Sequence, residues 1–257
     1  MALVKVVYNS LAMFCIAMFG SAGRGGPVRE PARGWFLAFL FWLLLSTGCE
    51  VERGGLPGQT GAPAVPVSFS GAESQSWKER SAEARKAKDK AFQEAESPLA
   101  DSYRAGFKGL SYYPIDPRYC FQGRIYRLPQ GQFIRMAASD GEMRKAIHWG
   151  YFRFQLSADT ICTLQVYKMI DPDPRVQESL FLPFIDAGAG KETYGGGRFL
   201  DLEEKAEGDY IVDFNQAYNP YCAYGKKYSC PVPPRENRLS VAIPAGEKIF
   251  VREDKTD

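Results

Sequence analysis

Histidine is almost absent from this sequence, which contains only His148 among its 257 residues. Zinc sites built from several imidazoles need more than one histidine, and the HExxH motif of metalloproteases needs two. Both kinds of site are therefore excluded, and we predict neither a bound metal nor a cofactor. His148 itself stands beside Trp149 in an expected strand, a position typical of a packed or surface histidine.

An excess of charge of one sign is also absent, since 32 lysines and arginines face 30 acidic residues. Proteins that bind nucleic acid usually carry a basic face that contacts the phosphates. We therefore expect no nucleic-acid partner. A nucleotide-binding phosphate loop is excluded as well, because Gly188-Ala189-Gly190-Lys191-Glu192 has neither the spacing of that motif nor its serine or threonine.

Residues 1–48 have the pattern of a targeting leader rather than of a folded domain. Two apolar runs, Leu3–Gly20 and Trp35–Thr47, are separated by basic, proline and glycine residues, and the second run leads into Cys49. Small residues before a cysteine, after an apolar run, form the lipobox of a bacterial lipoprotein. We therefore expect cleavage before Cys49, lipidation of that cysteine, and a membrane anchor on the periplasmic or extracytoplasmic face of the cell envelope.

A pair of transmembrane helices is the alternative interpretation of the two apolar runs. As a helix, Trp35–Thr47 would be about 20 Å long, which is short of the hydrocarbon core of about 30 Å. The leader is also longer than the usual length of about 15–30 residues. A start codon near Val28 would explain this length, because REPARG would then supply a short basic region.

Glycine, proline, serine and alanine dominate residues 49–75, and large apolar residues are few after Leu56. This composition predicts a flexible tether with a root-mean-square span of about 25–30 Å. Such a tether would hold a single globular domain, residues 76–257, clear of the lipid headgroups.

Trp77–Glu96 is the one stretch with convincing helical spacing. Its less polar face carries Trp77, Ser81, Ala84, Ala91, Phe92 and Ala95. Ser97-Pro98 ends the pattern, because proline disfavours helix at the residue before it. The lysines and arginines of this segment are typical of a solvated face, and contact with anionic lipid is the alternative.

After Pro117 the hydrophobic period changes from helical to two. Short strands are expected at 119–128, 132–137, 143–149, 151–156, 160–169, 179–184, 209–214, 239–243 and 248–252. Asp140-Gly141 is a hairpin-turn sequence. Because no helix is expected between the strands, the fold class is mainly β: an antiparallel sandwich or partly open barrel with one N-terminal amphipathic helix.

Three polar blocks follow one another between Phe184 and Lys248: KETYGGGRFLDLE, DYIVDFNQAYNPYCAYGKKYSCPVPP and ENRLSVAIPAGEK. In this order and spacing they resemble the bacterial and archaeal family known as domain of unknown function 1684. Upstream, SPLADSYRAGFKGLSYYPIDPRY resembles the N-terminal part of that family, so the resemblance covers Trp77–Val251. Ala187–Gly190 takes the place of a more polar run in the family pattern. The resemblance implies a domain and a site, but no agreed activity.

The polar residues of these blocks are the candidates for a ligand site at the end of the sheet. They are Asp186, Glu192, Tyr194, Arg198, Asp213, Asn215, Asn219, Glu236 and Asn237. A buried polar group without a partner costs roughly 1–3 kcal/mol. We therefore expect these residues either to form one hydrogen-bonded network or to surround a ligand.

Two features within the blocks each allow two interpretations. One is the glycine run Gly195-Gly196-Gly197 beside Arg198, which suits an anion. Glycines expose backbone N–H groups, and arginine forms bidentate hydrogen bonds with carboxylate or phosphate. The alternative is a tight turn, with Arg198 paired to Asp201 or Asp213. Four clustered tyrosines next to amides suit a sugar or peptide, or else simply pack in the core and loops. They are Tyr218, Tyr221, Tyr224 and Tyr228.

Cys222 and Cys230 flank a short loop, and in an exported domain this spacing predicts a disulfide, worth roughly 2–3 kcal/mol. A thiolate nucleophile and a two-cysteine metal site are the alternatives. Cys120 and Cys162 lie in separate expected strands, where they form either a second bridge or part of the core.

Two functions fit these residues. The first is a tethered binding or envelope-assembly module whose polar pocket takes a glycan-like or anionic small-molecule or cell-wall ligand. The second is a hydrolase that uses Cys222, or a pair of carboxylates drawn from Asp186, Glu192, Asp213 and Glu236. The absence of a conventional catalytic triad favours binding.

Overall fold

The structure is a computed structural model that describes residues 51–53, 55–170, 179–225 and 227–251. All of these residues belong to one unit, Cys49–Asp257. The expected leader, the alternative start near Val28 and the expected lipidation site Cys49 lie outside the described residues.

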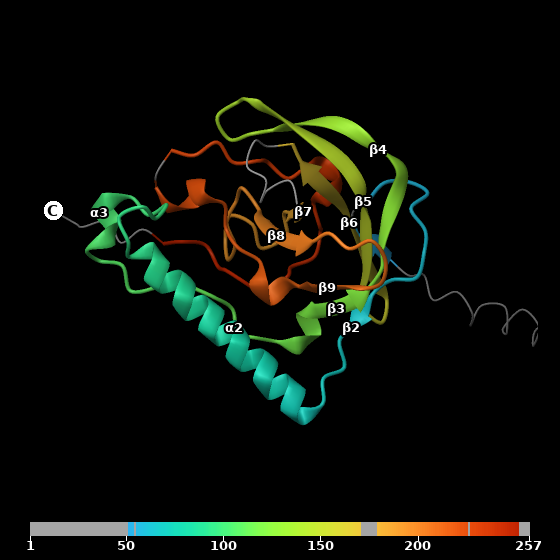
Figure 1. The fold of residues 1–257 in the computed structure, drawn as a ribbon, viewed down its shortest axis with the longest axis horizontal. Coiled ribbons are helices and arrows are strands. Elements are labelled where there is room, and N and C mark those ends of the chain that lie inside the picture. The colour runs from blue at the N-terminus through green and yellow to red at the C-terminus, as the bar shows by residue number, and fades with distance from the viewer. Residues whose placement is uncertain (1–50, 54, 171–178, 226, 252–257) are drawn as a thin grey trace, which may run out of the picture. The chain divides into compact units, whose positions relative to one another are not determined.

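The larger of two sheets has five antiparallel strands in spatial order β4-β5-β6-β7-β8, and β1 pairs with β6 in parallel off this path (Figure 1). The strands are β1 (Val51–Arg53), β4 (Ile125–Ala137), β5 (Met143–Ser157), β6 (Thr160–Met169), β7 (Ser179–Phe184) and β8 (Arg198–Glu203). Asp140-Gly141 forms the turn of the β4–β5 hairpin, as expected, with Gly141 at a φ of 88°.

The smaller sheet has three antiparallel strands, β2 (Val65–Pro66), β3 (Cys120–Gly123) and β9 (Tyr210–Asp213). It faces the larger sheet across the main hydrophobic core. Phe121 of β3 contacts Phe154 of β5, with ring centroids 4.9 Å apart. Burying one such ring contributes about 1.5–3 kcal/mol. The two sheets therefore form a sandwich, which confirms the predicted mainly β fold class.

Most expected strands are present, but the pattern near the C-terminus differs from the prediction. Residues 198–203, RFLDLE, form β8, although no strand was expected there. Residues 239–243 and 248–251 form no strand, and these two predictions are wrong for the described residues. The backbone N–H groups of residues 239–243 bond to isolated partners instead of forming a continuous ladder. Leu239 N–H donates to the Ile185 carbonyl, and Ile243 N–H donates to the Asp186 side chain.

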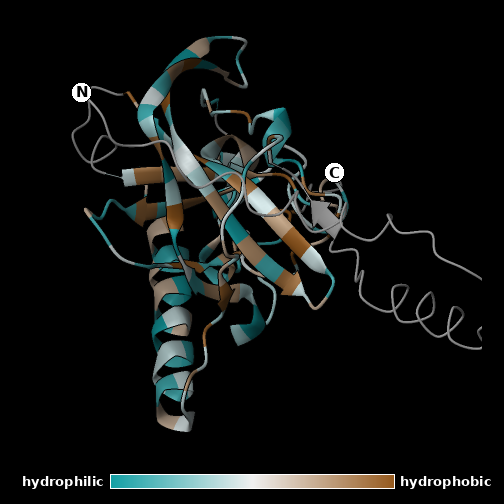
Figure 2. Ribbon diagram, turned by 90° about the vertical axis from the view of Figure 1, so that its right-hand side faces the viewer, coloured by the Kyte–Doolittle hydropathy of each residue, from teal (hydrophilic) through white to brown (hydrophobic). Residues whose placement is uncertain are grey.

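Helix α2 spans Gly71–Phe92, so it begins and ends earlier than predicted. Ser70 and Glu73 form a capping box at its start, which explains the earlier beginning. Hydrophilic residues recur along the whole helix (Figure 2). Its buried positions are Trp77, Ser81 and Phe92. A four-residue helix, α3 (Asp101–Arg104), follows.

The described part of the predicted tether is docked on the larger sheet, which corrects the expectation of a flexible segment there. Tyr151 donates its hydroxyl to the Thr60 carbonyl at 2.7 Å, and Tyr126 donates to Ala62 at 2.9 Å. Ala64 is buried and pairs with Phe154. Composition misleads here because main-chain carbonyls, rather than large apolar side chains, make most of the contacts.

Candidate functional site

Arg198, the first residue of β8, is 1% exposed, and its guanidinium contacts other groups of the protein. Its guanidinium donates to main-chain carbonyls of the segment 243–247, at 2.8 Å to Ile243 and 3.1 Å to Glu247. It also lies 3.5 Å from the Asp186 carboxylate. Burial lowers the pKa of Arg198, and the charge of Asp186 counteracts this effect. The residue fastens the segment 243–247 to the sheet rather than facing solvent.

The glycine loop before Arg198 is a tight turn. The N–H of Gly197 donates to the Tyr194 carbonyl at 3.0 Å. Gly197 has a φ of 90°, and a Cβ there would lie 2.7 Å from the Phe184 carbonyl oxygen, so only glycine fits. The turn alternative therefore describes this loop, but the ion-pair partner of Arg198 is Asp186, not Asp201 or Asp213.

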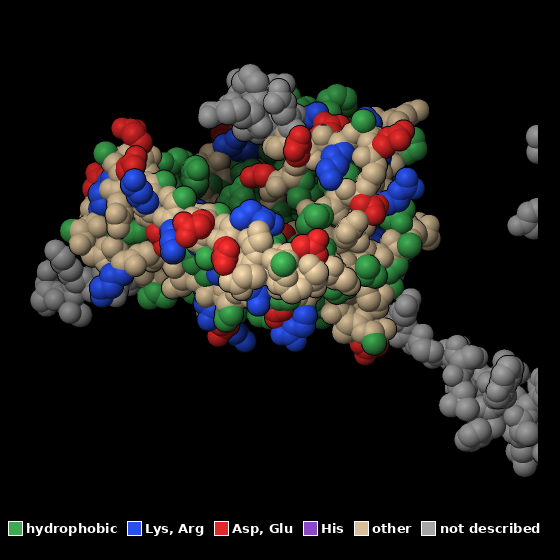
Figure 3. All heavy atoms as spheres, turned by 60° about the horizontal axis from the view of Figure 1, so that its bottom comes forward, with side chains coloured by type: hydrophobic (Ala, Val, Ile, Leu, Met, Phe, Trp, Pro, Cys, Tyr) green, Lys and Arg blue, Asp and Glu red, His purple; other side chains and the backbone are tan. Residues whose placement is uncertain are grey.

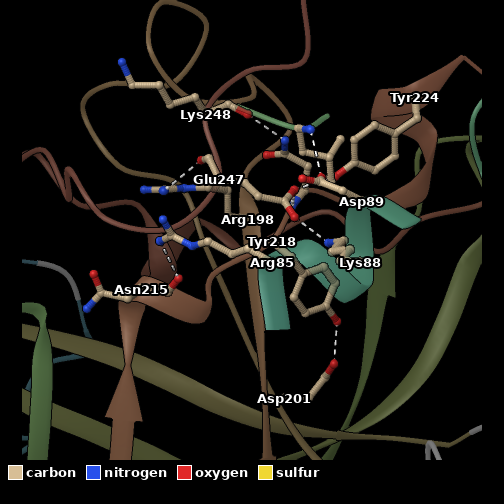
Figure 4. Close-up of polar contacts among 12 residues, drawn as sticks. Arg85, Lys88, Asp89, Arg198, Asp201, Asn215, Tyr218, Tyr224, Glu247 and Lys248 are labelled. Atoms are coloured by element: carbon tan, nitrogen blue, oxygen red, sulfur yellow. Dashed lines mark hydrogen bonds and ion pairs between the residues drawn. The ribbon is translucent and has the colours of Figure 1, made fainter. Parts of the chain in front are cut away.

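A buried carboxylate, Glu247, joins α2 to the second polar block (Figure 4). It accepts hydrogen bonds from Lys88 of α2, from the Tyr224 hydroxyl and, at 2.9 Å, from the Asn219 N–H. The Asn219 side-chain amide donates to the Lys248 carbonyl at 2.8 Å. This network is satisfied by the protein, except for the side-chain oxygen of Asn219, which has no protein partner.

Asp213 and Asn215 form a separate network at the end of β9. Asp213 accepts hydrogen bonds from the Trp77 indole at 3.0 Å and from the Asn215 N–H at 2.9 Å. The Asn215 side chain exchanges two 2.8 Å bonds with the backbone of Asp116. Arg85 of α2 donates to the Asn215 carbonyl at 3.2 Å. These contacts hold the helix against the sandwich.

Asn237 lies in η4 (Arg235–Asn237), against β6 and β7. Its amide exchanges bonds of 2.7 and 2.8 Å with the backbone of Gln165, and donates to Pro183 at 2.6 Å. Glu236 beside it is half-buried. Asn237 therefore bridges the larger sheet and the third block. Its hydrogen-bond partners differ from those of Glu247.

Two of the predicted site residues lie nearer the surface. Glu192 is exposed, 3.3 Å from the Lys248 ammonium and 3.3 Å from the Tyr113 hydroxyl. Tyr194 is half-buried, with its hydroxyl 3.7 Å from the Cys222 sulfur. The structure thus connects Asp186, Arg198 and Asn219 through the segment 243–247, and places Asp213 with Asn215. Asn237 and Glu236 belong to a different part of the fold.

A polar pair that the sequence did not single out as a site lies on the outer face of β8. Tyr218 donates its hydroxyl to Asp201 at 2.5 Å, and both groups are visible below Lys88 in Figure 4. Asp201 is exposed, yet burial raises the pKa of its carboxyl. The carboxylate of Asp201 therefore lies at the surface, with part of its surroundings formed by protein.

Aromatic rings form the floor beneath this pair. Phe181 and Phe199 meet edge to face at 4.8 Å, and Phe199 meets Tyr218 in the same way at 5.9 Å. The Lys88 ammonium lies 5.1 Å from the centre of the Tyr218 ring. We call the surface formed by Asp201 and Tyr218, over the buried rings of Phe181 and Phe199, the aromatic hollow. On one face of the molecule, Figure 3 shows hydrophobic side chains at the bottom of a hollow, with charges of both signs around it.

The half-buried Glu236 influences the pKa of the buried Tyr167. Tyr167 belongs to the same buried cluster as Phe181 and Phe199. Burial raises the pKa of Tyr167, and the negative charge of Glu236 raises it further. Among the clustered tyrosines, Tyr224 is buried, whereas Tyr221 is 50% exposed. The tyrosines therefore divide between packing and surface roles.

The cysteines Cys222 and Cys230 are both free thiols in the structure, so the predicted disulfide is not formed in it. The Cys222 N–H lies 3.3 Å from the Cys230 sulfur. Cys120 and Cys162 are not joined in a disulfide with each other, and both are fully buried core residues of β3 and β6.

Comparison with known proteins places these residues in a family. The family model described as "Protein of unknown function (DUF1684)" matches residues 105–248. This match covers more than half of the chain. The chain belongs to the DUF1684 family.

This DUF1684 protein is also similar to a solved structure. It is the solution NMR structure of the uncharacterized protein from gene locus rrnAC0354 of Haloarcula marismortui. That chain is 30% identical over 69% of this chain and 96% of its own, with a TM-score of 0.54. A search of curated proteins finds no match.

The described residues of this DUF1684 protein contain no group of three or more histidine, cysteine, aspartate or glutamate side chains placed to hold a metal ion. None of the helices in this described part is long and apolar enough to cross a membrane.

Sequence reasoning missed Lys88, Asp201 and Glu247 of this DUF1684 protein. Lys88 was assigned to a solvated helix face, and its inward direction depends on a carboxylate 159 residues away in sequence. Asp201 was considered only as a partner of Arg198. Glu247 had a usable signal, because it lies in the AGEK end of the third block.

Proposed function

We propose that this protein is a lipid-anchored component of the bacterial cell envelope whose β domain binds a sugar-like ligand in the aromatic hollow. The pair formed by Asp201 and Tyr218 carries this proposal. It combines a solvent-accessible carboxylate, a hydroxyl and an aromatic floor at one place.

The chemistry of the hollow suits a sugar better than a phosphate or carboxylate. Aromatic faces pack against the C–H faces of a pyranose, and a carboxylate accepts hydrogen bonds from its hydroxyl groups. Arg198, the residue expected to bind an anion, is 1% exposed and is held inside the protein by Asp186 and the segment 243–247. This favours the glycan-like ligand over the anionic one.

Envelope location rests on the leader and on Cys49, which follows an apolar run and small residues. In the bacterial envelope, the sugar-rich material within reach of a lipid-anchored domain is the cell wall. We therefore take fragments of peptidoglycan as the ligand class to test.

The test is titration of the reduced, full-length protein with soluble peptidoglycan fragments, followed by calorimetry. Asp201→Asn should weaken binding by about tenfold or more, because a hydrogen bond to a charged group contributes about 1.5–3 kcal/mol. Glu203→Gln is the matched control, since Glu203 is an exposed acid on the same strand and face. It should leave the affinity unchanged.

Two outcomes would reject the sugar-binding proposal. One is an absence of binding by the wild-type protein to any fragment at millimolar concentration. The other is an equal loss of affinity in Asp201→Asn and Glu203→Gln, because such a loss would reflect surface charge rather than the hollow.

Hydrolysis of the same ligand is the second candidate, and the raised pKa of the Asp201 carboxyl favours it. A general acid must keep its proton near working pH, and burial moves Asp201 in that direction. Among the other candidate carboxylates, Asp186 and Asp213 are occupied by internal hydrogen bonds, which leaves Glu192 and Glu236 as the partners to test. Mass spectrometry of the titrated fragments distinguishes the two functions: intact fragments support binding alone, and cleaved ones support hydrolysis.

A further inference from the structure

Cys222 and Cys230 lie side by side, and Ser139 from a separate segment fixes Cys230. Cys222 lies in η3 (Tyr221–Tyr224), half-buried, and its N–H is 3.3 Å from the sulfur of the buried Cys230. Cys230 is fixed in turn by Ser139, whose hydroxyl accepts from the Cys230 N–H at 3.0 Å and whose N–H donates to the Cys230 carbonyl at 2.8 Å. The pair is therefore positioned by the fold.

The surroundings divide the proton unequally between the two thiols. Hydrogen bonding from Cys230 lowers the pKa of Cys222 to about 6, against the effect of burial, and the Tyr194 hydroxyl at 3.7 Å lowers it further. The thiol of Cys230 is shifted in the opposite direction, with a raised pKa, because it donates to Cys222 and because it is buried. The sulfur of the half-buried Cys222 is thus the nucleophilic one, and the sulfur of the buried Cys230 holds the proton.

We propose that Cys222 and Cys230 form a redox-active dithiol that exchanges with disulfides, with Cys222 as the attacking and Cys230 as the resolving residue. This site is independent of the sugar-binding proposal. The co-reactant is a disulfide, either a small molecule or one exposed on another protein.

The reaction balances as a two-electron exchange. The Cys222 thiolate attacks one sulfur of the disulfide R–S–S–R, a mixed disulfide forms, and one R–S⁻ leaves. The Cys230 thiol then gives up its proton to that leaving thiolate and attacks the Cys222 sulfur. The second R–S⁻ departs, so the disulfide substrate is reduced and the Cys222–Cys230 pair is oxidised.

The chain supplies its own control thiols. Cys120 and Cys162 are fully buried in β3 and β6, and burial raises the pKa of Cys120 to about 12. A thiol of that kind is inert, whereas a half-buried thiolate is reactive. Site-resolved chemistry on the full-length protein therefore compares reactive and inert cysteines in one sample.

The first experiment measures the alkylation rate of each cysteine by iodoacetamide from pH 5 to 9, with peptide mass spectrometry to resolve the sites. For a pKa of about 6, the rate at Cys222 should change by only about 1.1-fold between pH 7 and 9. An ordinary thiol with a pKa near 8.5 should change by about 25-fold over the same interval. Cys120 and Cys162 should stay unmodified while the protein is folded.

The second experiment incubates the reduced protein and its Cys230→Ser and Cys222→Ser variants with oxidised glutathione. The wild type should form the Cys222–Cys230 disulfide, and a glutathione buffer of reducing composition should reverse it. Cys230→Ser should instead accumulate one glutathione at Cys222, because the resolving thiol is missing. Cys222→Ser should accumulate none.

Two results would overturn the proposal. An alkylation profile at Cys222 with a midpoint near pH 8.5 would show an ordinary thiol, and the wild type alone decides this, whatever the variants do. A Cys222–Cys230 disulfide that stays oxidised in reducing glutathione buffer would show a structural bridge instead of an exchanging one.

Discussion

At the scale of the residue, burial separates two kinds of polar side chain that look alike in the sequence. Asn219 and Asn237 are at most 1% exposed and bond mainly to backbone groups of other segments. Asp201 and Tyr218 make a polar pair that keeps access to solvent. The former hold loops in place, and the latter remain at the surface.

The raised pKa of Asp201 predicts a pH-dependent stability effect. A carboxyl whose pKa is higher in the folded than in the unfolded state binds its proton more tightly when folded, so its ionisation destabilises the fold as pH rises through that pKa. Asp201→Asn should therefore increase the free energy of unfolding at pH 7. The gain should vanish below about pH 4, the usual pKa of aspartate, where both states are protonated.

Urea unfolding of both proteins at pH 3.5 and pH 7 measures this difference. Glu203→Gln again serves as the control for loss of one surface charge. If Asp201→Asn is less stable than the wild type at pH 7, the carboxylate is stabilised where it lies, and the desolvation argument for the hollow is wrong.

The roles of the candidate site residues could be predicted only in part from the sequence. The sequence correctly draws attention to the block around Arg198, because polar and glycine residues are dense there. It does not say that Arg198 turns inward while Asp201, three residues later, turns outward. In a strand, neighbouring residues alternate between faces. The assignment of faces therefore requires knowing that 198–203 is a strand.

At the scale of the element, period-two patterns predict β3 to β7, but the pattern around β8 was hidden by the glycines before it. The expected strand at 239–243 has the right composition, yet it lies beside 185–187 as irregular chain. Helix α2 is a similar case, because its contacts to Asp213 and Glu247 are polar and long-range. Such tertiary contacts leave no periodic trace in the sequence.

The link between β8 and the segment 243–247 yields a test of structural against ligand roles for Arg198. Arg198→Ala leaves the Asp186 carboxylate buried without its cation and several carbonyls without a donor. Removing one partner of a buried ion pair costs about 3–5 kcal/mol. We therefore expect the free energy of unfolding in urea to fall by about that amount.

Arg235→Ala is the matched control for this substitution, because Arg235 is an exposed arginine in the same polar region. It should change the stability by less than about 0.5 kcal/mol. An Arg198→Ala protein of unchanged stability that had lost ligand binding would reverse the assignment, and would return Arg198 to the binding site.

At the scale of the whole molecule, the docked N-terminal segment would limit how far the domain can stand from the anchor proposed at Cys49. Val51 already pairs with Thr160 of β6, and the segment around Thr60 and Ala62 follows the sheet. If Cys49 carries the lipid, only residue 50 separates it from this pairing. The proposed anchor would then hold the domain at the headgroups, not about 25–30 Å above them.

Lipidation at Cys49 is the prediction on which the location of the whole molecule depends. Cys49→Ala should leave an uncleaved precursor or release the protein from the membrane fraction, because the cysteine is both the cleavage point and the lipid acceptor. Cys15→Ala is the matched control, since Cys15 lies in the first apolar run, away from the lipobox. Membrane fractionation and the intact mass of the mature protein are the measurements. If Cys49→Ala has the same membrane association as the wild type and differs in mass only by the substitution itself, the two apolar runs are better explained as transmembrane helices, and the envelope location would need a different anchor.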